Sequence, residues 1–136
     1  MSARPKIIVT IVALLALALV AGGCGSQSIK LAKSDANYRG AVLFRDHCSG
    51  CHTLGTVGAQ GSATSIKDRV RTNGPNFNQR KENVQQVLYA IRNGGFSGAI
   101  MPENIVVGDD AKAIAAFLAK YSGSQAAKVP TIENSQ

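Results

Sequence analysis

Three segments of the chain carry apolar residues on one side of a predicted helix, and in the second and third these residues recur at intervals of three and four. They cover residues 38–47, 82–93 and 109–120. Their apolar positions are Ala41, Val42 and Phe44 in the first, Val84, Val87, Leu88 and Ile91 in the second, and Ile114, Phe117, Leu118 and Tyr121 in and just after the third. The pattern therefore predicts an all-α domain.

The ends of these helices also have sequence signals. Gly94 and Gly95 directly follow the second helix and stop it, because glycine adopts the left-handed conformation of a helix end at little cost. Gly108 or Asp109 can cap the third helix. Residues 53–73, between the first two helices, contain repeated glycines and predict a long loop.

A different pattern begins the chain. Arg4 and Lys6 precede an almost wholly apolar run at residues 7–20. This run is shorter than the roughly 20 residues of a bilayer-spanning helix and is typical of a secretory signal peptide. Small residues at 21–23 lead to Cys24, so the segment resembles a bacterial lipoprotein signal, in which that cysteine is lipidated after cleavage. An ordinary cleaved signal and a retained anchor are the alternatives. All three place the remaining chain outside the cytoplasm.

The chain thus divides into four parts. We expect a signal peptide at 1–23, a lipidated Cys24 with a flexible tether at 24–36, one domain at 37–123 and a polar tail at 124–136. A flexible tether of this length would span roughly 20 Å root-mean-square. It would keep the domain close to the membrane face.

Composition adds two constraints. Among 136 residues there is no Trp and aromatic residues make up 5%, so a domain this small has difficulty filling a core from its own side chains. That hints at a large apolar cofactor. The net charge of +7 suits nucleic acid, an anionic membrane or an acidic partner. No aromatic residues are interleaved with the basic ones, so nucleic acid is not expected.

The central motif is Cys-Ser-Gly-Cys-His at residues 48–52, the C-x-x-C-H signature of c-type haem attachment. Cys48 and Cys51 would add to the two vinyl groups of one haem, and His52 would be the proximal ligand of its iron. A thioredoxin-like redox pair is less favoured, because no strand pattern precedes Cys48. A zinc site lacks ligands, since only His47 stands nearby. A disulfide within the motif would close a very short loop and stabilise little.

Beyond this motif, residues 37–122 resemble a small class I bacterial cytochrome c. Gly40 and Phe44 stand four residues apart, as the glycine and the aromatic residue do in the first helix of that family. The resemblance implies a small cytochrome c fold in which the first and last helices cross and the helices surround one covalently bound haem c. Gly40, Phe44, Ile114 and Phe117 would meet at that crossing. Generic packing of amphipathic helices is the alternative.

The resemblance also implies two further site residues. The family places a methionine ligand, frequently followed by proline, where this chain has Met101 and Pro102. Once the signal peptide is removed, Met101 is also the only methionine left. Pro75 would present its carbonyl oxygen to the far nitrogen of His52. The alternatives are a packing methionine that leaves the iron open, and a simple turn at Pro75.

The remaining basic residues are less specific. Lys67, Arg69 and Arg71 lie on the predicted loop, and Arg92 lies on the second helix. One of them could pair with a haem propionate, but spacing does not choose among them. The alternative is that each of them is a solvated surface charge.

These features predict an electron carrier and not an enzyme. With both axial positions filled by His52 and Met101, no small-molecule substrate can bind the iron, and one-electron transfer is the chemistry left. The protein would be lipid-anchored on the extracytoplasmic face of a bacterial membrane. Acidic docking surfaces on respiratory membrane complexes would be its partners. A fixed haem subunit of a larger oxidoreductase and a ligand-binding haem sensor with an open iron are the two alternatives.

Overall fold

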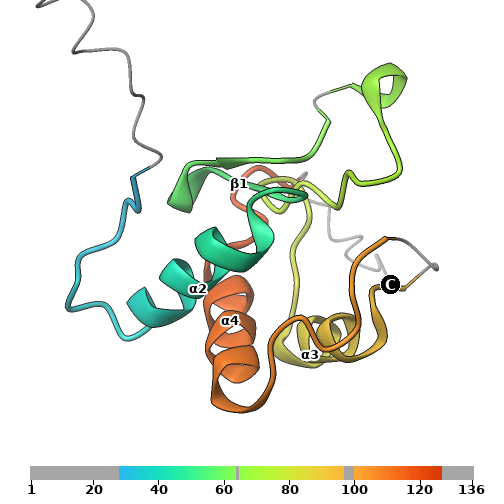
Figure 1. The fold of residues 1–136 in the computed structure, drawn as a ribbon. Coiled ribbons are helices and arrows are strands. Elements are labelled where there is room, and N and C mark those ends of the chain that lie inside the picture. Colours follow the sequence, from blue (N-terminus) through green and yellow to red (C-terminus); the bar gives the residue numbers. More distant parts are fainter. Residues whose placement is uncertain (1–27, 64, 97–99, 127–136) are drawn as a thin grey trace, which may run out of the picture.

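The computed structural model describes residues 28–63, 65–96 and 100–126. The expected signal peptide, Cys24 and most of the expected tail lie outside these residues. Three helices form the body of the molecule: α2 (Tyr38–Cys48), α3 (Val84–Asn93) and α4 (Gly108–Tyr121) (Figure 1). Within the described part of the chain, no helix has the length and apolar composition needed to cross a membrane.

Helices α2 and α4 cross at close range, as the sequence predicted. A side chain at Gly40 would collide with the backbone oxygen of Ala113 and would lie 2.7 Å from Cβ of Phe117. Next to this contact, the rings of Phe44 and Phe117 pack with their centroids 5.9 Å apart, and both side chains are fully buried. Ile114 is buried beside them. The absence of a side chain at Gly40 is therefore what lets the two helices approach.

The ends of α3 and α4 differ in part from the prediction. Helix α3 begins at Val84 and not at residue 82, because Asn83 caps it: the Asn83 side chain accepts from the Gln86 backbone, and the Gln86 side chain accepts from the Asn83 backbone. Val84 is 38% exposed, so its place on the buried stripe was wrong. Gly94 ends the helix as expected, with φ of 68°.

At α4 the predicted cap was wrong. Neither Gly108 nor Asp109 caps this helix; Val107 holds the capping position, without a side-chain hydrogen bond. Asp109 and Asp110 do lie in the first turn, where their charges favour the positive end of the helix dipole.

The segment predicted to be a loop contains a small antiparallel sheet. Strands β1 (Thr53–Leu54) and β2 (Ala59–Gln60) pair with Thr53 opposite Gln60, around the 3-10 turn η1 (Gly55–Val57). A second 3-10 turn, η2 (Ile66–Asp68), follows. The fold is thus mostly helical with one small two-stranded sheet, which is compatible with the small all-α fold that we expected. Two-residue strands are too short for an alternating pattern to reveal.

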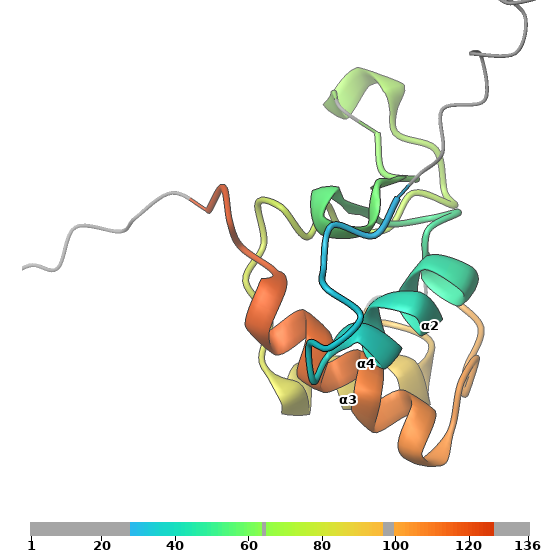
Figure 2. The same ribbon diagram turned by 90° about the vertical axis from the view of Figure 1, so that its left-hand side faces the viewer.

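The segment before α2 also differs from the flexible tether we expected. Ile29 and Leu31 pack against the core, and the Lys30 backbone N–H donates to the Thr56 carbonyl at 2.8 Å. Further along, Asp35 accepts a hydrogen bond from the hydroxyl of Tyr121 at the end of α4. From Ser28 onward, the segment therefore belongs to the folded domain (Figure 2).

Candidate functional site

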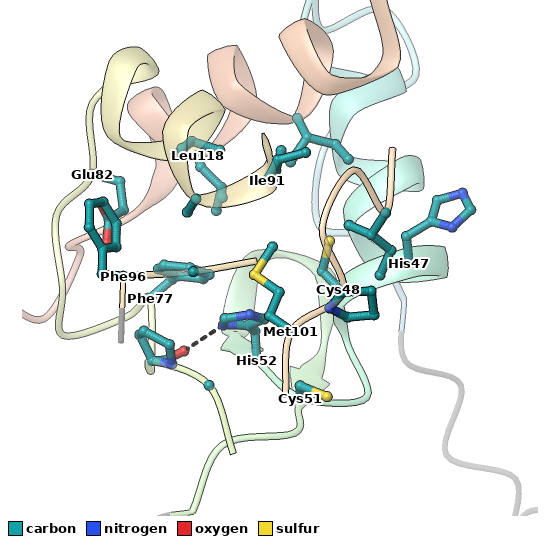
Figure 3. A pocket seen from close by; sticks show the side chains of 18 of the residues that line it. His47, Cys48, Cys51, His52, Phe77, Glu82, Ile91, Phe96, Met101 and Leu118 are labelled. Carbon is teal, nitrogen blue, oxygen red and sulfur yellow. Dashed lines mark hydrogen bonds between the residues drawn. The ribbon is translucent and has the colours of Figure 1, made fainter. Parts of the chain in front are cut away.

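An apolar pocket lies between the segment after α2, the loop leading to α3, helix α3 and the loop before α4 (Figure 3). It encloses roughly 1090 Å³ of empty space, counting the part open to solvent. Five of the six predicted site residues line it: Cys48, Cys51, His52, Pro75 and Met101. The sixth, Cys24, lies outside the described residues.

His52 is held in one orientation by contacts from three sides. Its Nδ1 lies 3.2 Å from the carbonyl oxygen of Pro75, which accepts a hydrogen bond from the ring (Figure 3). The ring of Phe77 stacks on it, with centroids 4.8 Å apart and an interplanar angle of 15°. Gly74 lies so close that any side chain there would collide with the imidazole. With Nδ1 engaged, Nε2 is the nitrogen left to bind a metal.

The surroundings of His52 favour the neutral form of its ring. Burial lowers the pKa of His52, the carbonyl of Pro75 partly opposes that shift, and the guanidinium of Arg80 lowers it further. A neutral imidazole is the form that coordinates a metal ion.

The two thiols lie on a turn that continues from α2. The backbone N–H groups of Cys51 and His52 both donate to the carbonyl of Cys48, at 3.2 and 3.0 Å. Cys48 is partly buried, whereas Cys51 is exposed, and both thiols are free. Burial raises the pKa of the Cys48 thiol to about 12, with a further contribution from Cys51. Redox-active C-x-x-C pairs instead have a lowered pKa, so the thioredoxin alternative loses support.

A zinc site finds no support in the same region. In residues 28–63, 65–96 and 100–126 there is no group of three or more His, Cys, Asp or Glu side chains placed to hold a metal ion. Two thiols and one imidazole on an apolar wall suit an organic group that carries its own metal.

Met101 reaches the pocket from the loop between α3 and α4. Its side chain is partly buried and packs against the core. The loop is tied back to α3 where the Asn104 backbone N–H donates to the Ile91 carbonyl at 2.8 Å. Met101 and His52 thus line one cavity although they lie 49 residues apart in the sequence (Figure 3).

Sequence reasoning missed a charged pair at one end of the pocket. Glu82 is 5% exposed and accepts from Nε of Arg80 at 2.6 Å, and both residues line the cavity. Burial raises the pKa of Glu82, and Arg80 opposes that shift. The segment before α3 has no periodic pattern, so nothing in the sequence pointed to this pair. Of the four basic residues that the sequence offered for a propionate, only Arg71 lines this pocket.

The residues present fit a haem. The space is large, mostly apolar and bordered by two thiols, an oriented imidazole and a thioether. Gly74 leaves room for the imidazole plane, as a larger residue would not. Arg71 and Arg80 supply positive charge at the edge of an otherwise apolar cavity, which suits a flat apolar ring with acidic substituents.

The crossing of α2 and α4, the C-x-x-C-H turn and the apolar pocket beside it define a class I cytochrome c. The model of one protein family, described as cytochrome c oxidase, cbb3-type, subunit III, matches residues 35–118. That match spans α2, the pocket loops, α3 and most of α4. The chain therefore belongs to this family, and its cytochrome c domain binds haem c covalently. A search of the curated proteins and a search of the solved structures found no match.

Proposed function

We propose that the protein is a membrane-tethered mono-haem cytochrome c that carries electrons between respiratory complexes, from a quinol-oxidising complex to a terminal oxidase or a similar pair. Family membership supports electron transfer by haem. The observation that carries the proposal is the convergence of Cys48, Cys51, His52 and Met101 on one apolar pocket.

In this proposal each residue has one task. Cys48 and Cys51 hold the haem through thioether bonds, and His52 and Met101 are the two axial ligands of its iron. Bound haem supplies one-electron exchange between the ferrous and ferric states. The thioether of Met101 is soft and neutral, so it favours the ferrous state and raises the reduction potential.

The surrounding residues keep this geometry fixed. The Pro75 carbonyl and the Phe77 ring hold the imidazole plane of His52. The ligand would therefore move little when the iron gains or loses an electron. Buried side chains of α3 and α4, including Val87, Ile91 and Ile114, exclude water from the ring. A dry pocket with fixed ligands is what an outer-sphere carrier requires.

We expect the electron to leave the haem at the edge next to Cys51. Cys51 is exposed while Cys48 is partly buried, so the edge of the haem next to Cys51 would lie closest to a partner. Removal of residues 1–23 would take away Arg4 and Lys6, so the net charge of +7 would fall by two to +5. We propose that acidic docking surfaces on respiratory membrane complexes bind this cationic protein transiently, with an affinity that falls as salt rises.

Location follows from the first 24 residues. We propose that a lipoprotein signal peptide at 1–23 is removed and that Cys24 is lipidated. Acyl chains on and beside that cysteine would give the two-chain anchoring that one chain cannot. The domain would then lie on the extracytoplasmic face of a bacterial membrane.

A second candidate function has one specific observation in its favour. The matching family is described as a subunit of a cbb3-type oxidase, so the chain could be a fixed haem subunit that passes electrons to a catalytic partner. Purification in mild detergent separates the two proposals. A complex of fixed stoichiometry favours the subunit, whereas a free cytochrome with salt-sensitive partners favours the carrier.

The sharpest test of the site replaces one ligand. In Met101→Ala, haem stays attached through the two thiols, so a pyridine haemochrome spectrum still shows one c-type haem. The iron–sulfur absorption feature disappears, and the reduced protein gains carbon monoxide binding. Ile100→Ala is the matched control, because this neighbour also lines the pocket but is 51% exposed and offers no ligand atom.

Two results would contradict this assignment. An unchanged spectrum in Met101→Ala would show that another group is the sixth ligand. Rapid carbon monoxide binding by the unaltered protein at neutral pH would favour the open-iron sensor instead.

A further inference from the structure

We propose that the loop at residues 65–73, which we name the basic loop, is a second membrane contact that binds the anionic headgroups of phospholipids. This inference rests on the proposed lipid anchor at Cys24. It adds an orientation: the end of the molecule that carries the basic loop faces the membrane.

The basic loop combines exposed positive charge with an exposed apolar side chain. Lys67, Arg69 and Arg71 are all exposed, and Val70 between them is 61% exposed. Asp68 is the only acidic residue on the loop. Within the part of the chain that the structure describes, none of the three cations takes part in an ion pair, although five such pairs form elsewhere.

The loop is fixed at its base. The side chain of Asn73 accepts a hydrogen bond from the Val70 backbone at 2.8 Å and donates one to the Gly61 carbonyl at 2.8 Å. The Gly74 backbone N–H then donates to the Cys51 carbonyl at 2.7 Å. The loop is therefore held by its own contacts in its position on the domain, so its charges stay at one end of the molecule.

The described chain begins in the same half of the molecule, the half away from α3. The basic loop, with η2 at its tip, projects past the β1–β2 hairpin in both views, whereas the first described residues lie level with that hairpin and, in Figure 1, on its other side (Figures 1 and 2). The bond from Lys30 to Thr56 holds the N-terminal segment there. Ser28 follows Cys24 by four residues, a path of at most about 14 Å.

An acyl chain on Cys24 would thus bring this end of the domain to the membrane surface. Cations near an anionic leaflet strengthen binding by about fivefold per residue, and the effect declines within a Debye length of roughly 10 Å. Val70 offers an apolar side chain to the interface between headgroups and acyl chains.

The test separates the loop from the anchor. A mature chain of residues 24–136 with Cys24→Ser, loaded with haem, is mixed with vesicles of equal parts phosphatidylglycerol and phosphatidylcholine, and bound haem is measured after sedimentation. Lys67→Gln combined with Arg69→Gln should weaken binding by about 25-fold at roughly 0.1 M salt, where the Debye length is about 10 Å. Vesicles of phosphatidylcholine alone should bind neither form.

A matched control removes two charges elsewhere. Arg92→Gln with Lys112→Gln lowers the net charge equally on α3 and α4, both exposed positions away from the loop. This variant should lose affinity by less than about threefold, because these charges lie far from the lipid relative to the Debye length. Equal losses in the two double variants would overturn the proposal, since binding would then reflect net charge alone.

A further arm uses the lipidated protein. In vesicles with phosphatidylglycerol, trypsin should cut after Lys67 and Arg69 more slowly than in vesicles of phosphatidylcholine alone; equal rates would overturn the proposal. Unchanged vesicle binding with slower electron transfer to an acidic redox partner would also overturn it, and would make the basic loop a protein-docking surface.

The haem spectrum and lipid labelling of Cys24, taken on the same samples, report on the proposed function independently. A normal c-type spectrum with labelled Cys24 and no effect of the loop charges would defeat the membrane contact alone. Absence of haem or of lipid would instead defeat the proposed function.

Discussion

The two walls of the pocket differ in how firmly the protein holds them. On the histidine side, formed by α2, α4 and the residues around His52, the side chains of Phe44, Leu54 and Phe117 are completely buried. On the methionine side, residues 94–96 and 100–107, the large side chains of Phe96 and Ile100 are 58% and 51% exposed.

This difference shows which ligand the polypeptide positions by itself. The His52 ring is oriented by the Pro75 carbonyl and the Phe77 ring. Met101 lies on a segment tied to α3 by the Asn104 bond to Ile91 and by the buried Val106. On the histidine side the contacts thus hold the ligand ring itself, whereas on the methionine side they hold the segment beside the ligand.

The largest expected effect is on the histidine side. Phe44→Ala should lower the free energy of unfolding by about 3–5 kcal/mol, because it leaves a cavity in a fully buried cluster. Val107→Ala on the methionine side is the control, because this side chain is 64% exposed and lies outside the pocket lining, and it should contribute less than about 1 kcal/mol. Guanidinium unfolding of the haem-loaded proteins measures both. Similar losses in the two variants would break the distinction between the walls.

A smaller effect is expected at the crossing of α2 and α4. Gly40→Ala should cost about 1–3 kcal/mol, since the new methyl group would collide with Ala113 and Phe117. Gly50→Ala is the matched control, because a methyl group there meets nothing within 4 Å. The same unfolding measurement applies. If both substitutions were neutral, the helices would not be held as closely as the structure indicates.

The smallest expected effect concerns the attachment of the N-terminal segment, residues 28–36, to α4. The hydroxyl of Tyr121 and then the backbone N–H of Asn37 lower the pKa of Asp35 from its usual 3.8 to about 2. The ionised carboxylate therefore contributes stability that is fully present above pH 3.8 and is lost as pH falls toward about 2.

Tyr121→Phe removes the hydroxyl donor, so the pKa of Asp35 should rise toward its usual value. The carboxyl carbon resonance of Asp35, followed by NMR across this pH range, measures the shift. Tyr38→Phe offers a control hydroxyl that forms no bond to Asp35 among the described contacts. A carboxyl that titrates identically in the Tyr121 variant would mean that the N-terminal segment is not bound there.

Periodic positions made the helices predictable, because regular helices convert sequence spacing into faces. Their crossing came from the family resemblance, and Gly40 and Phe44 on α2 do meet Phe117 on α4, with Ile114 buried beside them. The expectation that failed concerned residues 28–36, where Ile29 and Leu31 are too few and irregular to form a pattern, yet are sufficient to fasten the segment.

The pocket was predictable only where a motif carries the chemistry. The cysteines and His52 are marked by a five-residue signature, and Pro75 and Met101 came from family resemblance. The Arg80–Glu82 pair has no such mark, because two residues in an irregular segment come together only through the course of the backbone. The β1–β2 hairpin was missed for the same reason.

The attachment of Ile29 and Leu31 to the domain has a consequence for encounters. With Cys24 as the proposed anchor, only three residues separate the lipid attachment from Ser28, so the domain would stay close to the membrane surface. Its search for a partner then becomes lateral diffusion in two dimensions at nearly constant height. A redox partner would have to present its electron entry site close to the membrane surface, at the height of the anchored domain.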